Sequence, residues 1–143
     1  PLNPLGRGDN LDRAILHAVR ALPFVDPRRV ALQGGSAGGW MTLMVAAETF
    51  PIVYAMPDVP PIHWGYNAGF IDTNRPYARG AREGDPPRLP NTLAVSTITD
   101  QARKTYGMPW ESDTYLATSP IAQLDTITAP TLVVFSTADM LVP

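Results

Sequence analysis

One stretch of the sequence, from Val30 to Trp40, constrains the fold more than any other. It reads Val-Ala-Leu-Gln-Gly-Gly-Ser-Ala-Gly-Gly-Trp, in which a short apolar run leads directly into a serine flanked by glycines. An apolar segment without Pro or Gly then continues to Thr49. A strand, the pattern Gly-x-Ser-x-Gly and a helix, in this order, indicate a nucleophile elbow, which is a sharp turn that exposes a reactive serine.

The elbow makes specific demands on its glycines. The serine backbone is strained at such a turn, and we expect side chains at Gly34 and Gly38 to collide with the neighbouring strand and helix. Ser36 then stands at the N-terminus of the following helix, where the N–H of Ala37 can donate to an oxyanion. The alternative is an ordinary glycine-rich turn between a strand and a helix.

Composition and charge exclude several classes of protein. A chain of 143 residues is long enough for one domain with a core, and a net charge of −2 gives no indication of nucleic-acid or membrane-surface binding. The absence of cysteine excludes disulfides and thiolate metal sites. No apolar run approaches the roughly 18 residues of a membrane span. Because no His, Asp and Glu cluster has metal-ligand spacing, neither a metal nor another cofactor is predicted.

The residues before the elbow predict one surface helix. Asp9 or Asn10 can cap it, and it is expected to run to about Leu22 and to pack on the sheet. Helical spacing places apolar and charged residues on opposite faces. The apolar face consists of Leu11, Ile15, Ala18, Val19 and Leu22, and the charged face of Arg13, His17 and Arg20. The first strand is predicted at Val30 to Gln33.

The residues after the elbow predict further layers of an α/β fold. The helix that follows Ser36 has almost no polar face and is expected to be buried. Ile52 to Met56 is predicted as a central parallel strand, and Thr131 to Phe135 as another parallel strand. The expected fold is therefore a mostly parallel sheet with helices on both faces.

A long excursion, residues 57–118, follows the second strand, and no linker divides the 143 residues into domains. A helix is predicted within it, from about Thr99 to Tyr106. Ser119-Pro120 then predicts a cap and first-turn proline for a short helix from Ile121 to Leu124.

Four stretches together resemble a known family. They are Arg29–Gly39, Tyr106–Glu111, Ser119–Ile121 with Ile127–Val134, and Ser136–Pro143. In combination they are similar to the catalytic domain of the prolyl oligopeptidase family of serine peptidases, within the α/β-hydrolase superfamily. Residues 71–103 lie outside the resemblance and are expected to be an insertion on the substrate side.

The resemblance implies a catalytic triad with Ser36 as the nucleophile and Asp139 as the orienting carboxylate. Asp139 also follows a predicted strand at the carboxyl edge of the sheet, and the order serine, acid, histidine fits this superfamily. The alternative for Asp139 is an ordinary turn aspartate. Asp58 follows the preceding strand and is the competing acid, although lining the pocket or capping the turn suits it better.

Neither histidine of the chain qualifies as the base. His17 lies on the charged face of the first helix, and His63 suits a pocket wall better. In the family the triad histidine follows the aspartate, and the second oxyanion donor comes from a loop that would precede Pro1. We therefore expect residues 1–143 to be part of a catalytic domain, nearly inactive alone, with the remainder of that domain as partner.

The segment His63-Trp64-Gly65-Tyr66 matches by position the aromatic segment that lines the substrate pocket in related peptidases. An aromatic pocket would suit proline or another compact apolar group; the alternative is that Trp64 and Tyr66 fill the core. The predicted function is a serine hydrolase that cleaves peptide bonds through an acyl-enzyme. The alternatives are a carboxylesterase, with a small ester as substrate, and a catalytically dead hydrolase fold used as a binding module.

Overall fold

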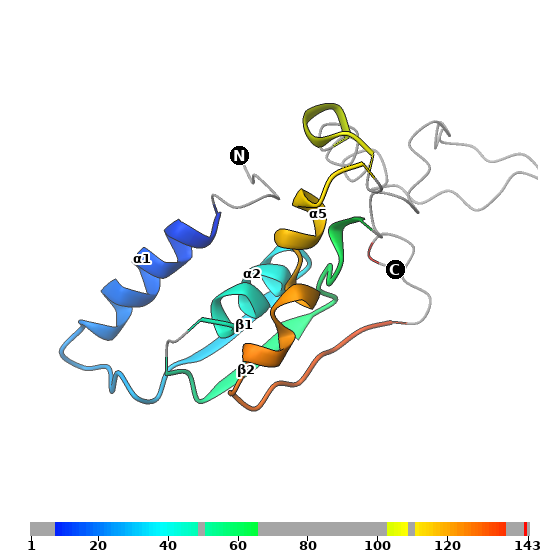
Figure 1. Cartoon of the computed structure of the whole chain (residues 1–143). Coiled ribbons are helices and arrows are strands. Elements are labelled where there is room, and N and C mark those ends of the chain that lie inside the picture. The colour runs from blue at the N-terminus through cyan, green and yellow to red at the C-terminus, as the bar shows by residue number, and fades with distance from the viewer. Residues whose placement is uncertain (1–7, 49–50, 66–102, 109–110, 137–141, 143) are drawn as a thin grey trace, which may run out of the picture.

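The computed structural model describes residues 8–48, 51–65, 103–108, 111–136 and 142 (Figure 1). It contains helices, strands and short 3₁₀ turns in an alternating order typical of an α/β fold. The elements are α1 (Gly8–Arg20), β1 (Ala31–Gly35), α2 (Ala37–Ala46), β2 (Tyr54–Asp58), α5 (Thr114–Ala117), η1 (Pro120–Ala122) and η2 (Leu124–Thr126). No helix among these residues is long and apolar enough to cross a membrane.

The two strands β1 and β2 lie side by side in parallel, as predicted (Figure 1). Ala31 is opposite Tyr54 at one end of the ladder, and Gly35 is opposite Asp58 at the other. The strand β2 begins and ends two positions later than the prediction of Ile52 to Met56. The end is later because β2 continues through Pro57, whose carbonyl still accepts the Val134 N–H although the proline has no N–H of its own.

The segment predicted as a third strand, Thr131 to Phe135, runs parallel to β2 but touches it through two separate bridges. These pair Ala55 with Thr131 and Asp58 with Val134. The ladder position between the bridges falls on Pro57, which cannot donate a hydrogen bond to the neighbouring segment. β2 is therefore central, as predicted, while its outer neighbour does not form a continuous strand.

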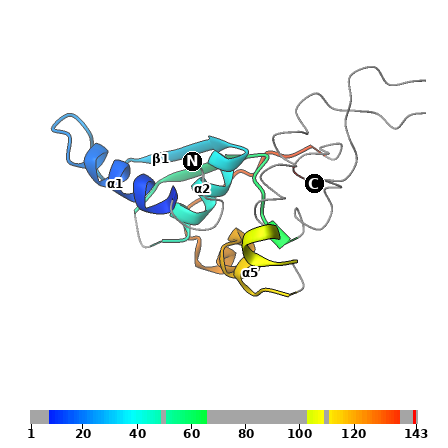
Figure 2. The same ribbon diagram turned by 90° about the horizontal axis from the view of Figure 1, so that it is seen from above.

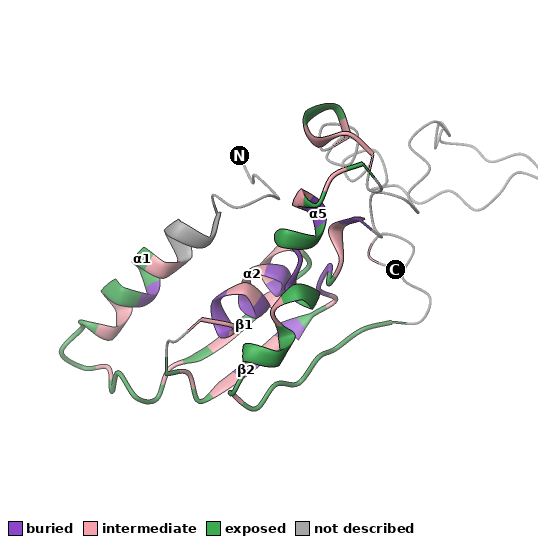
Figure 3. Ribbon diagram, in the orientation of Figure 1, coloured by how far each residue is buried: buried purple, intermediate pink, exposed green. Residues whose placement is uncertain are grey.

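The helix α2 covers the strands and forms the core, and Figure 2 shows α2 and α5 on one face of the sheet. Its buried residues are Gly39, Trp40, Thr42, Leu43, Val45 and Ala46. The one polar side chain among them, Thr42, donates its hydroxyl to the carbonyl of Gly38 at 2.9 Å. Figure 3 shows the contrast with residues 131–136, which are exposed. The predicted burial of this helix is confirmed, and a second helical layer stays a prediction.

The orientation of α1 differs from the prediction. Leu16 is its buried side chain, whereas Ile15 and Leu22, on the predicted apolar face, are 52% and 40% exposed. The reason is that α1 packs against α2 rather than flat on the sheet, with the Arg13 guanidinium on the carboxylate of Glu48 just beyond α2. The helix also ends at Arg20, two residues earlier than expected.

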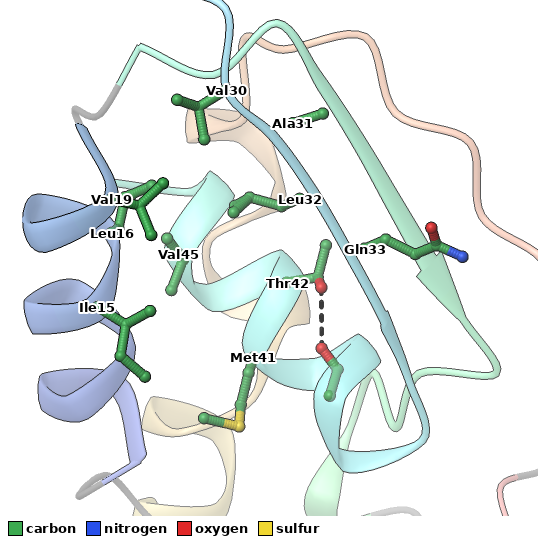
Figure 4. Close-up of a pocket in the computed structure, with 11 residues that line it drawn as sticks. Ile15, Leu16, Val19, Val30, Ala31, Leu32, Gln33, Met41, Thr42 and Val45 are labelled. Carbon is green, nitrogen blue, oxygen red and sulfur yellow. Dashed lines mark hydrogen bonds between the residues drawn. The ribbon is translucent and has the colours of Figure 1, made fainter. Parts of the chain in front are cut away.

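A cavity of about 300 Å³ remains between α1, β1 and α2 (Figure 4). Most of its lining is apolar, with Leu16 and Val19 from α1, Leu32 from β1, and Met41 and Val45 from α2. The cavity lies where α1 packs against α2 and does not cover part of β1. Neither Ser36 nor Asp58 lines it.

The region after α5 departs from the prediction of a capped helix at Ile121 to Leu124. Two 3₁₀ turns, η1 and η2, replace it, and the Ser119 hydroxyl forms no cap hydrogen bond with η1. The hydroxyl instead donates to the carbonyl of Tyr115 and accepts the backbone N–H of Trp64. Residues 103–106 are helical, in agreement with the end of the helix predicted from Thr99.

Candidate active site

Ser36 occupies a strained turn between β1 and α2. Its backbone has φ 54° and ψ −118°, a region that residues other than glycine rarely adopt. Two hydrogen bonds hold it there: its N–H donates to the Asp58 carbonyl at 2.9 Å, and its own carbonyl accepts the Trp40 N–H at 3.0 Å. The side chain is exposed. The turn therefore presents the hydroxyl to solvent, and such strain persists only where the surroundings enforce it.

The glycines around Ser36 have unequal roles. A Cβ at Gly34 would overlap the carbonyl of Gly38, so the prediction for Gly34 is confirmed. A Cβ at Gly38 would meet nothing within 4 Å, so the prediction for Gly38 is wrong. The second demanding position is Gly39, where a Cβ would lie 2.8 Å from the Asp58 carbonyl oxygen. Gly39, the third residue of α2, is therefore the one that closely approaches the end of β2, while Gly38, the second residue, faces open space.

Ala37 is the first residue of α2. The N–H groups of a first helical turn have no partner within the helix, and they carry the positive end of the helix dipole. The N–H of Ala37, which directly follows Ser36, is one of these groups. Its role as an oxyanion donor stays a prediction.

Asp58 and Ser36 lie at the same edge of the sheet, as the parallel strands predict. Asp58 ends β2 opposite Gly35, its side chain is exposed, and its Oδ2 lies 3.9 Å from the position of a Cβ on Gly35. The next residue, Val59, has φ 40°, which is rare for a β-branched side chain. Its N–H donates to the Val134 carbonyl at 2.7 Å. Backbone strain thus occurs at the residue that follows each strand, Ser36 after β1 and Val59 after β2.

Asp139 and Tyr66 lie outside the described residues. The segment that leads to Asp139 reaches the same sheet edge, because Val134 is in register with Asp58. His63 is half-buried in the segment that follows β2. His17 is exposed on α1, on the face expected from the sequence.

Trp64 belongs to an aromatic cluster that the sequence did not predict. Its ring meets that of Trp40 edge to face, with 6.1 Å between centroids and 66° between planes. It also packs against the buried Tyr115. The indole Nε1 of Trp40 donates to the Thr118 carbonyl at 3.0 Å. These contacts agree in part with the alternative that Trp64 fills the core.

Burial also changes the titration of this cluster. It raises the pKa of the Tyr115 phenol, against the opposing positive charge of Arg103. The phenol donates to the Gly107 carbonyl at 2.9 Å. Tyr115 is therefore a neutral donor near neutral pH. In the part of the chain that the structure describes, no three His, Cys, Asp or Glu side chains gather into a possible metal site.

Comparisons with known proteins identify the family and the fold of the chain. A sequence model of the prolyl oligopeptidase family matches residues 11–105. No curated protein matches the chain. Among solved structures, the uncomplexed Pyrococcus horikoshii acylaminoacyl peptidase is similar, with a TM-score of 0.66 and 20% sequence identity. The match covers 94% of this chain and 18% of that chain.

Two further structures have the same fold. An acylaminoacyl peptidase in complex with Z-Gly-Gly-Phe-chloromethyl ketone gives a TM-score of 0.63 and 20% identity, over 94% of this chain and 18% of the other. A puromycin hydrolase gives a TM-score of 0.52 and 17% sequence identity. That match covers 84% of this chain and 15% of the hydrolase chain. The chain thus spans less than a fifth of the length of these proteins. The family model matches more than half of the chain, which therefore belongs to the prolyl oligopeptidase family.

Proposed function

We propose that this chain carries the nucleophile of a serine peptidase that cleaves peptide bonds through an acyl-enzyme. The observation that supports this most is the conformation of Ser36. An exposed serine held at φ 54° between a parallel strand and a helix costs conformational free energy, which a plain turn would avoid by using glycine. Retained strain at this residue argues against a catalytically dead binding module.

Each candidate residue has a role in the proposed reaction. The Ser36 Oγ attacks the substrate carbonyl, and its proton passes to a histidine base. The N–H of Ala37 stabilises the oxyanion of the tetrahedral intermediate. The intermediate collapses to the acyl-enzyme as its C–N bond breaks and the histidine gives its proton to the leaving amine. Asp139 orients the histidine, and Asp58 lines the edge beside the nucleophile. The acyl-enzyme is then hydrolysed by water that the same histidine activates.

We propose that the base comes from outside residues 1–143. The chain has two histidines. His17 is exposed on α1, which packs against α2, and His63 belongs to the proposed pocket segment. In a well-studied serine protease, loss of the triad histidine alone lowers turnover by about 10⁶-fold. We therefore expect residues 1–143, expressed alone, to show almost no turnover; rapid turnover would place the base within them.

The family and the aromatic segment that contains Trp64 support the proposed substrate class. The structural neighbours named as acylaminoacyl peptidases, one of them bound to a peptidyl chloromethyl ketone, support a peptide substrate. Trp64 and His63 would form one wall of its pocket, with Tyr66 following them in sequence. A carboxylesterase uses the same intermediate, so the elbow alone does not separate the two activities.

The test compares two substrates with the complete gene product that carries this chain. An aminoacyl-proline p-nitroanilide reports peptidase activity, and a p-nitrophenyl ester reports esterase activity. We expect turnover of both, and loss of both in Ser36→Ala, because one nucleophile serves both reactions. Turnover of the ester alone would reject the peptidase assignment, and turnover unchanged in Ser36→Ala would reject Ser36 as nucleophile.

A further inference from the structure

We propose that Ser119 is a positioning residue for the substrate pocket, which it serves by holding the backbone of Trp64 in place. This inference rests on the proposed function for the pocket, but the contacts that carry it are independent of any activity. Ser119 is completely buried, and it lies far from Trp64 in sequence.

The hydrogen bonds of Ser119 have a fixed direction. A hydroxyl has one hydrogen to donate and lone pairs to accept. The Tyr115 carbonyl has no hydrogen, so the Ser119 hydroxyl must donate to it, and the lone pairs then accept the Trp64 backbone N–H at 2.9 Å. The first bond is local to the turn after α5. The second joins this turn to the segment that follows β2.

The neighbouring residue holds the other indole. The Thr118 carbonyl accepts the Nε1–H of Trp40, and the two indole rings touch edge to face. We call Trp40, Trp64, Thr118 and Ser119 the indole clamp. Trp40 is 2% exposed and lies in the first turn of α2, where its backbone N–H bonds to the Ser36 carbonyl. The clamp therefore links the proposed pocket wall to the helix that begins at the nucleophile.

Within the part of the chain that the structure describes, the Trp64 ring is held in place without a hydrogen bond from its own indole nitrogen. Its own Nε1 is buried, and among the described residues it has no hydrogen-bond partner. The ring is thus not anchored through its polar atom. Its packing contacts and the backbone bond to Ser119 locate it, and the Ile121 N–H also joins the two segments by donating to the Ile62 carbonyl at 3.1 Å. Because this second bond remains, loss of the Ser119 hydroxyl should shift the wall without detaching the segment, and it should leave Ser36 and its oxyanion donor in place.

The experiment removes the hydroxyl with Ser119→Ala in the complete gene product. Two indoles in edge contact give an exciton-coupled pair of circular-dichroism bands, which Trp40→Phe and Trp64→Phe identify by abolishing it. We expect Ser119→Ala to weaken this pair and to raise KM for the peptide substrate about fivefold, the effect of one lost hydrogen bond. The turnover number for a small p-nitrophenyl ester, which does not fill the pocket, should not change.

Thr126→Val is the matched control. The Thr126 hydroxyl also bonds to a carbonyl of its own turn, that of Gln123 at 2.8 Å, and to a carbonyl distant in sequence, that of Ala47 at 2.9 Å, but Thr126 is not part of the clamp. This variant should keep the band pair and the peptide KM. An unchanged band pair and an unchanged KM in Ser119→Ala, or equal effects in Thr126→Val, would overturn the inference.

Two further outcomes are distinguishable. If the wild-type protein cleaves neither substrate, the proposed function fails, while the band pair still tests whether Ser119 positions Trp64. If Ser119→Ala does not fold, Ser119→Cys keeps a weak donor and acceptor of similar size. It should then give the same changes to a smaller extent, and their absence would count against the clamp.

Discussion

Substituting alanine for each of two adjacent glycines, Gly38 and Gly39, should have opposite effects. Both lie in the first turn of α2. The added methyl at Gly38 meets open space, whereas at Gly39 it would lie 2.8 Å from the Asp58 carbonyl oxygen and 3.1 Å from Pro60 Cβ. The same Asp58 oxygen accepts the Ser36 N–H. A shift of this carbonyl would therefore disturb the nucleophile itself.

The magnitudes follow from the contacts. Alanine has a helix propensity up to about 1 kcal/mol better than glycine, so Gly38→Ala should stabilise the protein by about 0.5–1 kcal/mol. Gly39→Ala gains the same term but adds about 1–3 kcal/mol of overpacking and weakens one hydrogen bond worth about 1 kcal/mol. Its net effect is a destabilisation of about 1–3 kcal/mol. The two variants should thus differ by about 1.5–4 kcal/mol in the free energy of unfolding.

Urea unfolding of the two variants in the complete gene product measures this difference. Acylation of Ser36 by a fluorophosphonate should be slowed in Gly39→Ala and little changed in Gly38→Ala, because only the first displaces the partner of the Ser36 N–H. Destabilisation by Gly38→Ala together with tolerance of Gly39→Ala would refute the elbow geometry described above and restore the simple Gly-x-Ser-x-Gly expectation.

Two further predictions concern interactions outside the elbow. The Arg13–Glu48 ion pair joins α1 to the end of α2, and its side chains are 41% and 20% exposed. A double-mutant cycle should therefore give a coupling energy of at most about 1 kcal/mol. A much larger coupling energy would contradict a partly solvated pair. Because burial raises the pKa of Tyr115, its contribution to stability is complete below the pKa of about 10 of an unfolded tyrosine and is lost as pH rises through the folded value. The decline of unfolding free energy above about pH 10 should therefore be smaller in Tyr115→Phe, and an identical decline would show that the phenol does not titrate differently in the folded state.

The parts of the fold that could be predicted from the sequence depend on local patterns. The strand, the elbow and the apolar helix α2 follow one another within a short stretch, and each has its own signature in residue type and spacing. The shared edge of Ser36 and Asp58 follows from the parallel direction of the two strands. These features needed no information about distant residues.

The parts that could not be predicted depend on contacts between distant segments. Whether Gly38 or Gly39 must lack a side chain is decided by the Asp58 carbonyl, which belongs to β2. The buried side of α1 is decided by its packing on α2, which selects Leu16. The Ser-Pro pattern at Ser119 indicates a helix cap, but the hydroxyl bonds to Tyr115 and Trp64 instead, because the segment after β2 brings an unpaired N–H to it.

The most direct test of Ser36 as the nucleophile is to identify the residue that a fluorophosphonate modifies. The complete gene product is treated with the probe, digested and analysed by mass spectrometry, with Ser36→Ala as the control. We predict a single adduct on Ser36 in the wild-type protein and none in the variant, because only an activated serine reacts at a useful rate. An adduct on another serine, or a wild-type protein that cleaves peptides yet carries no adduct on Ser36, would contradict the assignment of Ser36 as the nucleophile.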